Sequence, residues 1–282
     1  MQVVQTGADW NKYWLEFIKN DKSIGLVPTM GALHEGHLDL IRKARLETDR
    51  VIVSIFVNPT QFNNQEDYDN YPSTLEQDLA KLKIENVDFV FIPNIDSIYP
   101  EKPKMNISFG KLETLLEGEF RPGHFNGVGL VVSKLFNIIK PHKAFFGQKD
   151  LQQTAIIKQL VKELSMEIHL EIVPTRREDD GLAMSSRNVR LSPEERRKAL
   201  ILYNSLTQAK QELLDGKQWF DVQNKIIQNF EEMPLVSLEY FELIHPESFM
   251  CYTDFDIDQK SSICVAAILG KIRLIDNLPI IP

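Results

Sequence analysis

The sequence predicts an α/β protein with a doubly wound parallel sheet, followed by a smaller α+β region. Strand-like and helix-like segments alternate over the first part of the chain, as right-handed strand–helix–strand crossovers require. One segment, 51–57, is a nearly continuous β-branched apolar run, typical of a central strand covered on both faces. Beyond about residue 175 the alternation stops. We therefore expect one domain over residues 1–175 and a second over 176–282.

The elements of the first domain follow from apolar patterns and from the prolines that end them. Pro28, Pro93, Pro141 and Pro174 each come just after an apolar segment. The predicted strands are 23–27, 51–57, 87–92, 143–146 and 167–173, and the predicted helices are 36–48, 74–84, 128–139 and 150–164. Residues 94–106 form a proline-rich connection that is predicted to be irregular.

The second domain begins with a helix signal at Ser192-Pro193-Glu194-Glu195. Serine caps a helix, proline suits its first position, and acidic residues favour its first turn. One long helix is predicted to run from there to 214, where Asp215-Gly216 ends it. A second helix at 220–231 and strands at 238–244, 263–269 and 273–275 complete the α+β pattern.

Composition excludes several classes of protein. With 282 residues, 43% hydrophobic and 26% charged, the chain is typical of a globular protein with a sizeable core. A net charge of −8 argues against a general nucleic-acid binder, although a local basic cluster can still hold a small anion. The two cysteines, Cys251 and Cys264, do not form a disulfide scaffold or a metal-site pattern. This cysteine usage predicts a reducing, cytoplasmic setting. No secretion-like start is apparent, and no apolar run approaches the ~18 residues of a membrane span.

The most informative motif is Pro28-Thr29-Met30-Gly31-Ala32-Leu33-His34-Glu35-Gly36-His37-Leu38, between a predicted strand and a predicted helix. Small residues let phosphates approach the backbone, and the helix start offers unpaired N–H groups. The two imidazoles can donate hydrogen bonds to charge that develops during phosphoryl or nucleotidyl transfer. An H-x-G-H run in this position indicates a nucleoside triphosphate site rather than surface histidines.

Three further motifs carry polar side chains just after predicted strands. Asn58 and Gln61 follow the second strand, and their amides suit a small hydroxy acid, although Asn-Pro is also a common turn. Phe146–Gln153 joins a strand to a helix. Its Lys149 either binds phosphate as a cation or is a solvated side chain at a capped helix start. Gly181–Asn188 combines two hydroxyls with Arg187, as a triphosphate clamp or a polar connection between domains.

These motifs should meet at one crevice, because ligands of doubly wound sheets bind beyond the carboxyl ends of the strands. Arg121 and His124 precede a helix and either contact phosphate or belong to a structural loop. The other histidines, His142, His169 and His245, lack ligand spacing and are interpreted as structural. The acidic residues 66, 67 and 69 are expected on a solvated loop.

The four motifs, in this order, resemble the pantothenate synthetase (pantoate–β-alanine ligase) family within the H-x-G-H nucleotidylyltransferase superfamily. The resemblance covers essentially the whole chain and includes Arg273-Leu274-Ile275-Asp276-Asn277. It implies a Rossmann-like domain, ATP as substrate, Mg²⁺ with the ATP, and a homodimer. It also implies a two-step reaction: pantoate attacks the α-phosphorus of ATP, and β-alanine then displaces AMP from the pantoyl adenylate. A carboxylate nucleophile needs alignment and charge stabilisation but no general base.

The resemblance also assigns roles to residues. It makes His37, His34, Lys149 and Arg187 catalytic, with His37 the better donor as pyrophosphate leaves. It places pantoate on Gln61 and Gln153, β-alanine near Gln61, and a metal contact on Asp150. The implied ATP-binding residues are Met30, Gly31, Ala32, Leu33, His34, Glu35, Gly36, His37, Gly147, Gln148, Lys149, Asp150, Arg176, Met184, Ser185, Ser186 and Arg187.

Three positions depart from the family pattern: Gln148 and His245 stand where acidic residues are frequent, and Asn63 where glycine is common. None of them belongs to the expected phosphate chemistry. Two other functions remain open at this point. A nucleotidylyltransferase would use the same H-x-G-H chemistry without β-alanine, and a non-catalytic nucleotide-binding protein would release no AMP.

Overall fold

The computed structural model describes residues 1–281, and the chain divides into two compact units. The first unit comprises Met1–Gln148 and Ile156–Pro174, and the second comprises Lys149–Ala155 and Thr175–Pro282. The segment Lys149–Ala155 thus groups with the C-terminal part of the chain, although it lies before residue 175.

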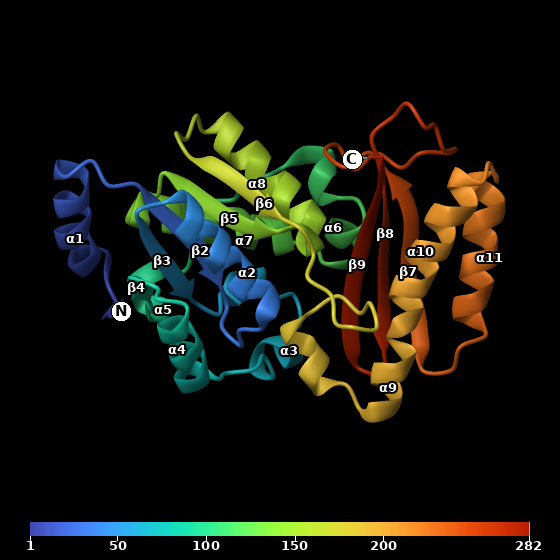
Figure 1. The fold of residues 1–282 in the computed structure, drawn as a ribbon, viewed down its shortest axis with the longest axis horizontal. Helices are drawn as coiled ribbons and strands as arrows, with labels where there is room; N and C mark the ends of the chain where they lie inside the picture. The colour runs from blue at the N-terminus through green and yellow to red at the C-terminus, as the bar shows by residue number, and fades with distance from the viewer. Residues whose placement is uncertain (282) are drawn as a thin grey trace. The chain divides into compact units, whose positions relative to one another are not determined.

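The first unit contains a six-stranded parallel sheet in the order β1-β4-β3-β2-β5-β6 (Figure 1). The strands are β1 (Gln2–Val4), β2 (Ile24–Thr29), β3 (Arg50–Ile55), β4 (Phe89–Phe91), β5 (Lys143–Gly147) and β6 (His169–Val173). The predicted doubly wound parallel sheet is confirmed. The strand order reverses between β2 and β5, so the carboxyl ends of these two strands flank the switch point where such sheets bind ligands.

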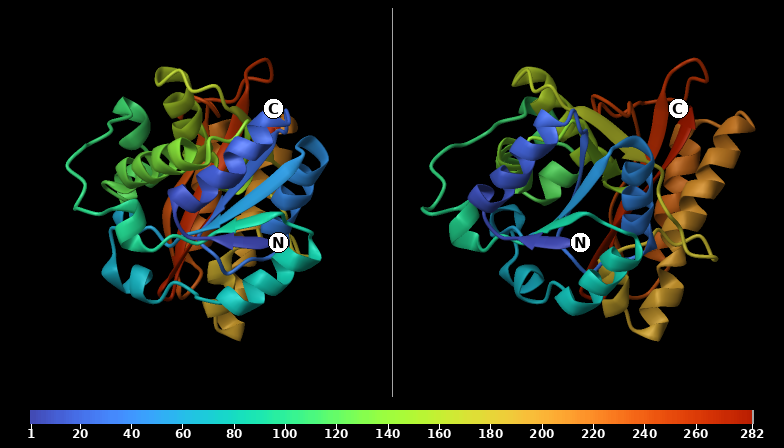
Figure 2. Two further views of the ribbon diagram at one scale, coloured as in Figure 1. Left: turned by 90° about the vertical axis from the view of Figure 1, so that its left-hand side faces the viewer. Right: turned by 60° about the vertical axis from the view of Figure 1, so that its left-hand side comes forward.

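Helices cover both faces of this sheet, because every central strand is apolar on both sides. On one face α2 (Glu35–Glu47) and α4 (Leu75–Ile84) pack Ile41, Ala44 and Leu82 against the strands (Figure 1). On the other face α1 (Gly7–Lys19) lies next to α7 (His124–Ile139) (Figure 2). The Trp10 indole N–H donates to the Ile139 carbonyl at 2.8 Å, which ties these two helices together. Helix α8 (Leu151–Glu163) precedes β6.

Several elements of the structure were not predicted from the sequence. No element is predicted before residue 23, yet β1 and α1 occupy that stretch. Residues 94–106, expected to be irregular, contain α5 (Ile95–Ile98), because the Asn94 side chain accepts a hydrogen bond from the Ser97 N–H at 2.7 Å. The acidic residues expected on a loop lie in α3 (Gln65–Asp69), which Asn64 caps in the same way. Helix α6 (Glu117–Phe120) and four short 3₁₀ turns (Pro59–Gln61, Gly110–Glu113, Gln148–Asp150 and Ser186–Arg190) are further short elements of the described chain.

The second unit is an antiparallel three-stranded sheet, β7-β8-β9, packed against helices. Its strands are β7 (Val236–Ile244), β8 (Ser261–Leu269) and β9 (Ile272–Ile281), and its helices are α9 (Pro193–Lys198), α10 (Leu200–Leu214) and α11 (Trp219–Glu231). The α+β prediction is confirmed, but the single helix predicted from 193 to 214 is wrong, since α9 and α10 meet at Ala199. Within residues 1–281, no helix is long and apolar enough to cross a membrane.

Candidate functional site

The H-x-G-H motif forms a tight loop between β2 and α2. Gly31 and Ala32 both adopt left-handed backbone conformations, with φ of 84° and 49°. A side chain at Gly31 would be strained at this φ and would also lie 3.2 Å from the Asp78 carboxylate. Such a conformation at the non-glycine residue Ala32 persists only where surrounding contacts hold it.

Asp78 of α4 supplies those contacts. Its carboxylate accepts hydrogen bonds from the Ala32 N–H at 2.9 Å and the Leu33 N–H at 2.8 Å, and the side chain is almost completely buried. The Thr74 hydroxyl donates to both carboxylate oxygens at 3.2 Å, and the Lys81 ammonium donates to the Leu33 carbonyl. Sequence reasoning misses Asp78, because an acid early in a helix is explained by the helix dipole alone. No local signal marks its partner 45 residues earlier.

The two histidines stand at the start of α2. His34 is the residue before the helix, and its backbone N–H donates to His37 Nδ1 at 3.3 Å. Because a backbone N–H can only donate, Nδ1 of His37 is the lone-pair nitrogen, and the proton of the neutral ring sits on Nε2. The ring centroids are 4.0 Å apart, and both side chains are half-buried. The loop therefore orients His37 with a ring N–H donor on the nitrogen away from its own backbone.

The two amides after β3 have different roles, and for Asn58 the structure supports the turn alternative that the sequence left open. Asn58 is completely buried, and its Nδ2 donates to Gln61 Oε1 and to the Gly127 carbonyl, each at 3.2 Å. Its Oδ1 accepts from the Tyr99 and Thr60 hydroxyls, each at 3.0 Å. With all its polar atoms bonded inside the protein, Asn58 orients Gln61 and has no capacity left for a ligand.

Gln61 has its Oε1 toward Asn58 and its Nε2 toward the Met30 sulfur at 3.0 Å. The amide nitrogen after β3 therefore contacts the loop after β2, which brings two of the predicted motifs together. Helix α7 presses closely on this turn, since a side chain at Gly127 would lie 2.2 Å from the Thr60 carbonyl oxygen. The absence of a side chain at Gly127 is what permits this approach.

His124, whose role the sequence leaves open, is a structural residue. It is 5% exposed, its Nδ1 lies 2.8 Å from the Gln61 carbonyl oxygen, and its Nε2 lies 3.1 Å from Arg121 Nη1. A guanidinium only donates, so Nε2 accepts from Arg121, and the Nδ1–H donates to the Gln61 carbonyl oxygen. His142 and His245 also accept backbone N–H groups, from Ile24 and from Glu247, in agreement with the structural roles predicted for them.

In the second unit, the segment from Arg176 to Arg187 folds back on itself. The Met184 N–H donates to the Arg176 carbonyl at 3.0 Å, and Arg177 pairs with Ala183 as an isolated antiparallel bridge. The Ser185 hydroxyl accepts from the Arg187 N–H at 3.2 Å and so begins the 3₁₀ turn Ser186–Arg190. This geometry brings the predicted residues Arg176, Met184 and Ser185 next to one another.

The residues described offer little for a resident metal ion. Within residues 1–281, no group of three or more His, Cys, Asp or Glu side chains could hold one. Asp150 is exposed at the end of the 3₁₀ turn Gln148–Asp150. A single exposed carboxylate fits a Mg²⁺ ion that takes its other ligands from water and substrate phosphates, as Mg²⁺ commonly does.

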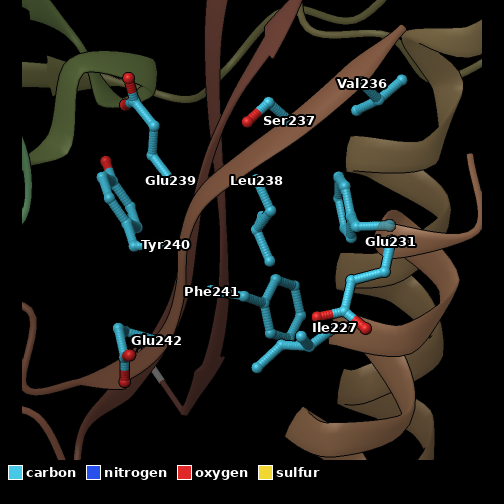
Figure 3. A pocket seen from close by; sticks show the side chains of 10 residues that line it. Ile227, Glu231, Val236, Ser237, Leu238, Glu239, Tyr240, Phe241 and Glu242 are labelled. Atoms are coloured by element: carbon cyan, nitrogen blue, oxygen red, sulfur yellow. The ribbon is translucent and has the colours of Figure 1, made fainter. Parts of the chain in front are cut away.

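Two hollows are useful for locating a site. One of about 600 Å³ lies beyond the carboxyl ends of β2, β3 and β4 and is lined by Met30, Gly31, Phe56 and Asp78, among others. The other, of about 520 Å³, lies between α11 and β7 in the second unit (Figure 3). Its rim carries Glu231, Glu239 and Glu242, and no predicted site residue lines it. The first hollow is the one related to the predicted chemistry, because Met30 and Gly31 of the H-x-G-H motif line it.

Comparison with known proteins decides the family. A family model described as pantoate-beta-alanine ligase matches residues 2–279. The chain belongs to the pantoate-beta-alanine ligase family. It is therefore an enzyme that joins pantoate to β-alanine, and the two other functions left open by the sequence are set aside.

Relatives of this ligase match over nearly their full length. The pantothenate synthetase of Thermotoga neapolitana is 46% identical over 278 residues, 98% of this chain and 99% of the relative. That of Caldicellulosiruptor bescii is 45% identical over 282 residues, 99% and 98% of the two chains. The crystal structure of the Thermus thermophilus pantothenate synthetase matches with a TM-score of 0.93 at 39% identity and 100% of both chains. The Francisella tularensis ligase, solved with beta-gamma ATP and beta-alanine, matches with a TM-score of 0.81 at 37% identity, covering 99% of this chain and 97% of that one.

The predicted site residues of the ligase fall into two sets, one in each unit. The first unit holds Met30, Gly31, Ala32, Leu33, His34, Glu35, Gly36, His37, Gln61, Gly147 and Gln148. The second holds Lys149, Asp150, Gln153, Arg176, Met184, Ser185, Ser186 and Arg187. Within the first unit the structure joins the H-x-G-H loop to Gln61, and within the second it joins Arg176 to the Met184–Arg187 segment.

Proposed function

We propose that this ligase uses ATP to condense (R)-pantoate with β-alanine through a pantoyl-adenylate intermediate, releasing pyrophosphate and AMP. In the first step a pantoate carboxylate oxygen forms a bond to the α-phosphorus, and the bond from that phosphorus to the pyrophosphate oxygen breaks. In the second, the β-alanine amine forms a bond to the activated carbonyl carbon, loses a proton, and AMP leaves with the electron pair of the C–O bond. Neither step needs a protein nucleophile.

The observation that carries this proposal is the contact between Gln61 Nε2 and the Met30 sulfur. It brings an amide N–H donor, suited to a carboxylate, against the loop that precedes the two histidines. The second hydrogen on Nε2 can then hold the pantoate carboxylate beside the nucleotide loop. A nucleotidylyltransferase without an organic acid substrate would have no use for a donor fixed in this way.

The histidines are proposed to stabilise the charge that builds up on the departing pyrophosphate. Nδ1 of His37 accepts a hydrogen bond from the His34 N–H, so the ring proton lies on Nε2, and we assign this Nε2–H to donate to a phosphate oxygen when ATP is bound. Donors fixed before the reaction stabilise the transition state without reorganisation. His34 contributes a second ring next to it.

The predicted residues of the second unit include cationic and hydroxyl side chains, and we propose a role for each. Lys149, Ser185, Ser186 and Arg187 would bind the phosphates, and the backbone near Thr175-Arg176 would contact adenine. Gln153 would bind pantoate. Asp150 would contact Mg²⁺ through one carboxylate, and the ion would neutralise part of the phosphate charge. We further propose that the enzyme is a cytoplasmic homodimer.

The test is a reconstitution with purified enzyme. ATP, Mg²⁺, pantoate and β-alanine are supplied together and with each omitted in turn, and AMP, pyrophosphate and pantothenate are measured. We expect AMP only when both organic substrates are present, and exchange of labelled pyrophosphate into ATP with pantoate alone. AMP production that ignores β-alanine, or pyrophosphate exchange that ignores pantoate, would contradict the proposed sequence of steps.

A further inference from the structure

The motif Arg273–Asn277 resembles the family pattern, but the proposed chemistry leaves it without a role. It lies in β9, and its last two residues, Asp276 and Asn277, are each only 3% exposed. A carboxylate and an amide buried in a strand are costly unless their hydrogen bonds are satisfied. Where their bonds go therefore indicates what the motif does.

Asn277 bonds to the segment that carries the predicted phosphate-binding lysine. Its Nδ2 donates to the Lys149 carbonyl oxygen at 2.9 Å, within the second unit. The two residues are 128 positions apart in the sequence, and this amide fixes the backbone from which the Lys149 side chain projects. Asn277 bonds to the backbone of Lys149 and not to its ammonium group.

Asp276 bonds to the other predicted phosphate-binding segment, through Arg177. The guanidinium donates from Nη1 to Oδ2 at 2.6 Å and from Nη2 to Oδ1 at 3.0 Å, which is the paired geometry that only arginine offers. Burial raises the pKa of the Asp276 carboxyl, and the Arg177 cation opposes this by favouring the charged form. The Arg177–Asp276 ion pair is therefore a largely buried contact within the second unit.

Arg177 also contacts the loop that leads to Arg187. Its Nη1 also donates to the Gly181 carbonyl at 3.1 Å, and the guanidinium lies 4.6 Å from the centre of the Tyr203 ring. Gly181 has φ of 97°, and a side chain there would lie 2.1 Å from Tyr203, so the loop has little freedom. The following residues pair back onto Arg176 and Arg177 and lead directly to Ser185.

We propose that Asp276 and Asn277 form a brace that sets the Lys149 segment and the Met184–Arg187 segment at a fixed spacing for ATP. Both segments are held by adjacent side chains of one strand, so neither can shift without the other. Asp276 and Asn277 are positioning residues, because the Asp276 carboxylate bonds to Arg177 and the Asn277 Nδ2 bonds to the Lys149 carbonyl. This inference rests on the proposed ATP-binding role of the two segments.

The experiment compares two variants with one control. Asn277→Leu keeps the side-chain size and removes the donor to Lys149, while Arg177→Lys keeps the charge but cannot bond to both oxygens of Asp276 and to Gly181. Glu239→Gln is the control, since it breaks the partly buried ion pair of Glu239 with Arg273 in the same sheet, with N–O distance 2.7 Å. For each enzyme we would measure KM for ATP, pantoate and β-alanine, the dissociation constant of a non-hydrolysable ATP analogue, and the unfolding midpoint.

A brace predicts that both variants weaken ATP and the analogue about five- to tenfold, as the loss of one hydrogen bond allows. KM for β-alanine should stay within about twofold, and the control should match the wild type in all substrates. The inference is overturned if ATP binding is unchanged, or if all three substrates weaken together as the unfolding midpoint falls. Binding of the analogue does not require the ligation reaction. A wild-type enzyme that binds the analogue but forms no pantothenate would therefore contradict the proposed function, while the variants could still be compared by their affinity for the analogue.

Discussion

Asn58 Nδ2 lies 3.2 Å from Gln61 Oε1, and this contact decides which end of the Gln61 amide faces the Met30 loop. An amide side chain can rotate by half a turn at little steric cost, so its orientation depends on its partners. Asn58 can impose one orientation because its own amide is held by Gly127, Tyr99 and Thr60. The binding group is thus prepared by a residue that is itself closed to ligands.

We expect Asn58→Asp to reverse the Gln61 amide, because the new carboxylate accepts hydrogen bonds only and would attract Nε2. KM for pantoate should then rise about tenfold or more, as expected when a charge-assisted hydrogen bond is lost, while KM for ATP changes little. Steady-state kinetics with each substrate varied would measure these KM values. Gln61→Ala gives the rise in KM for pantoate that is expected when the Gln61 amide is removed altogether. Tyr99→Phe is the control, since it removes one bond to Asn58 Oδ1 but leaves the Asn58–Gln61 contact. Equal losses for pantoate and ATP would contradict the assigned role of Gln61.

Asp78→Ala should loosen the nucleotide loop. It leaves the Ala32 and Leu33 N–H groups without their acceptor, and each buried unsatisfied donor costs about 1–3 kcal/mol. We expect a lower free energy of unfolding and a reduced kcat/KM for ATP, with KM for β-alanine less affected. Asp78→Asn, which retains one acceptor oxygen, should lie between this variant and the wild type. Denaturant unfolding measures the free energy of unfolding, and substrate kinetics measure kcat/KM for ATP. An unaltered kcat/KM for ATP in Asp78→Ala would show that nucleotide binding does not depend on the loop geometry that Asp78 holds.

His37→Ala should slow adenylate formation by about 10²-fold or more, the usual loss for one transition-state donor. The side chain is half-buried, so the fold should survive. Pyrophosphate exchange with pantoate present isolates this step from the reaction of β-alanine. His169→Ala serves as the control, because His169 is exposed and its ring pairs with Glu171 on the same strand. A wild-type exchange rate in His37→Ala would remove His37 from the mechanism.

The acid sensitivity of the second unit should depend in part on Glu212. Hydrogen bonds from Lys225 and Gln208 lower the pKa of this carboxyl to about 2. A carboxyl with a lowered folded-state pKa stabilises the protein above its unfolded-state pKa, and this contribution is lost as the pH falls toward 2. Because both lysine partners are about half exposed, Glu212→Gln should lower the free energy of unfolding by only about 0.2–1 kcal/mol at pH 7. Unfolding measured between pH 7 and pH 2 should show the difference shrinking, and a constant difference would exclude the ionised carboxylate as its cause.

The fold class was within reach of the sequence because its signals are local. The apolar run 51–57 overlaps β3, which ends two residues earlier, and the run 143–146 lies in β5. The start and end signals of α2, α4 and α11 agree with the structure to within one or two residues. The polar motifs were recognisable for the same reason, since each is contiguous and follows a strand. Elements that depend on weaker or longer-range signals, such as α1, α5 and the break between α9 and α10, were not predicted.

By itself the sequence determined the alternation of strands and helices, the polar motifs at strand ends, and hence the family and its substrates. Only the tertiary structure decided that Asn58 serves Gln61, that Asp78 holds the nucleotide loop, and that His124 is structural. It alone paired Asp276 with Arg177, 99 residues away. Periodicity and capping act between neighbours and are written in short stretches of chain, whereas a buried hydrogen bond depends on which distant groups the fold brings within about 3 Å.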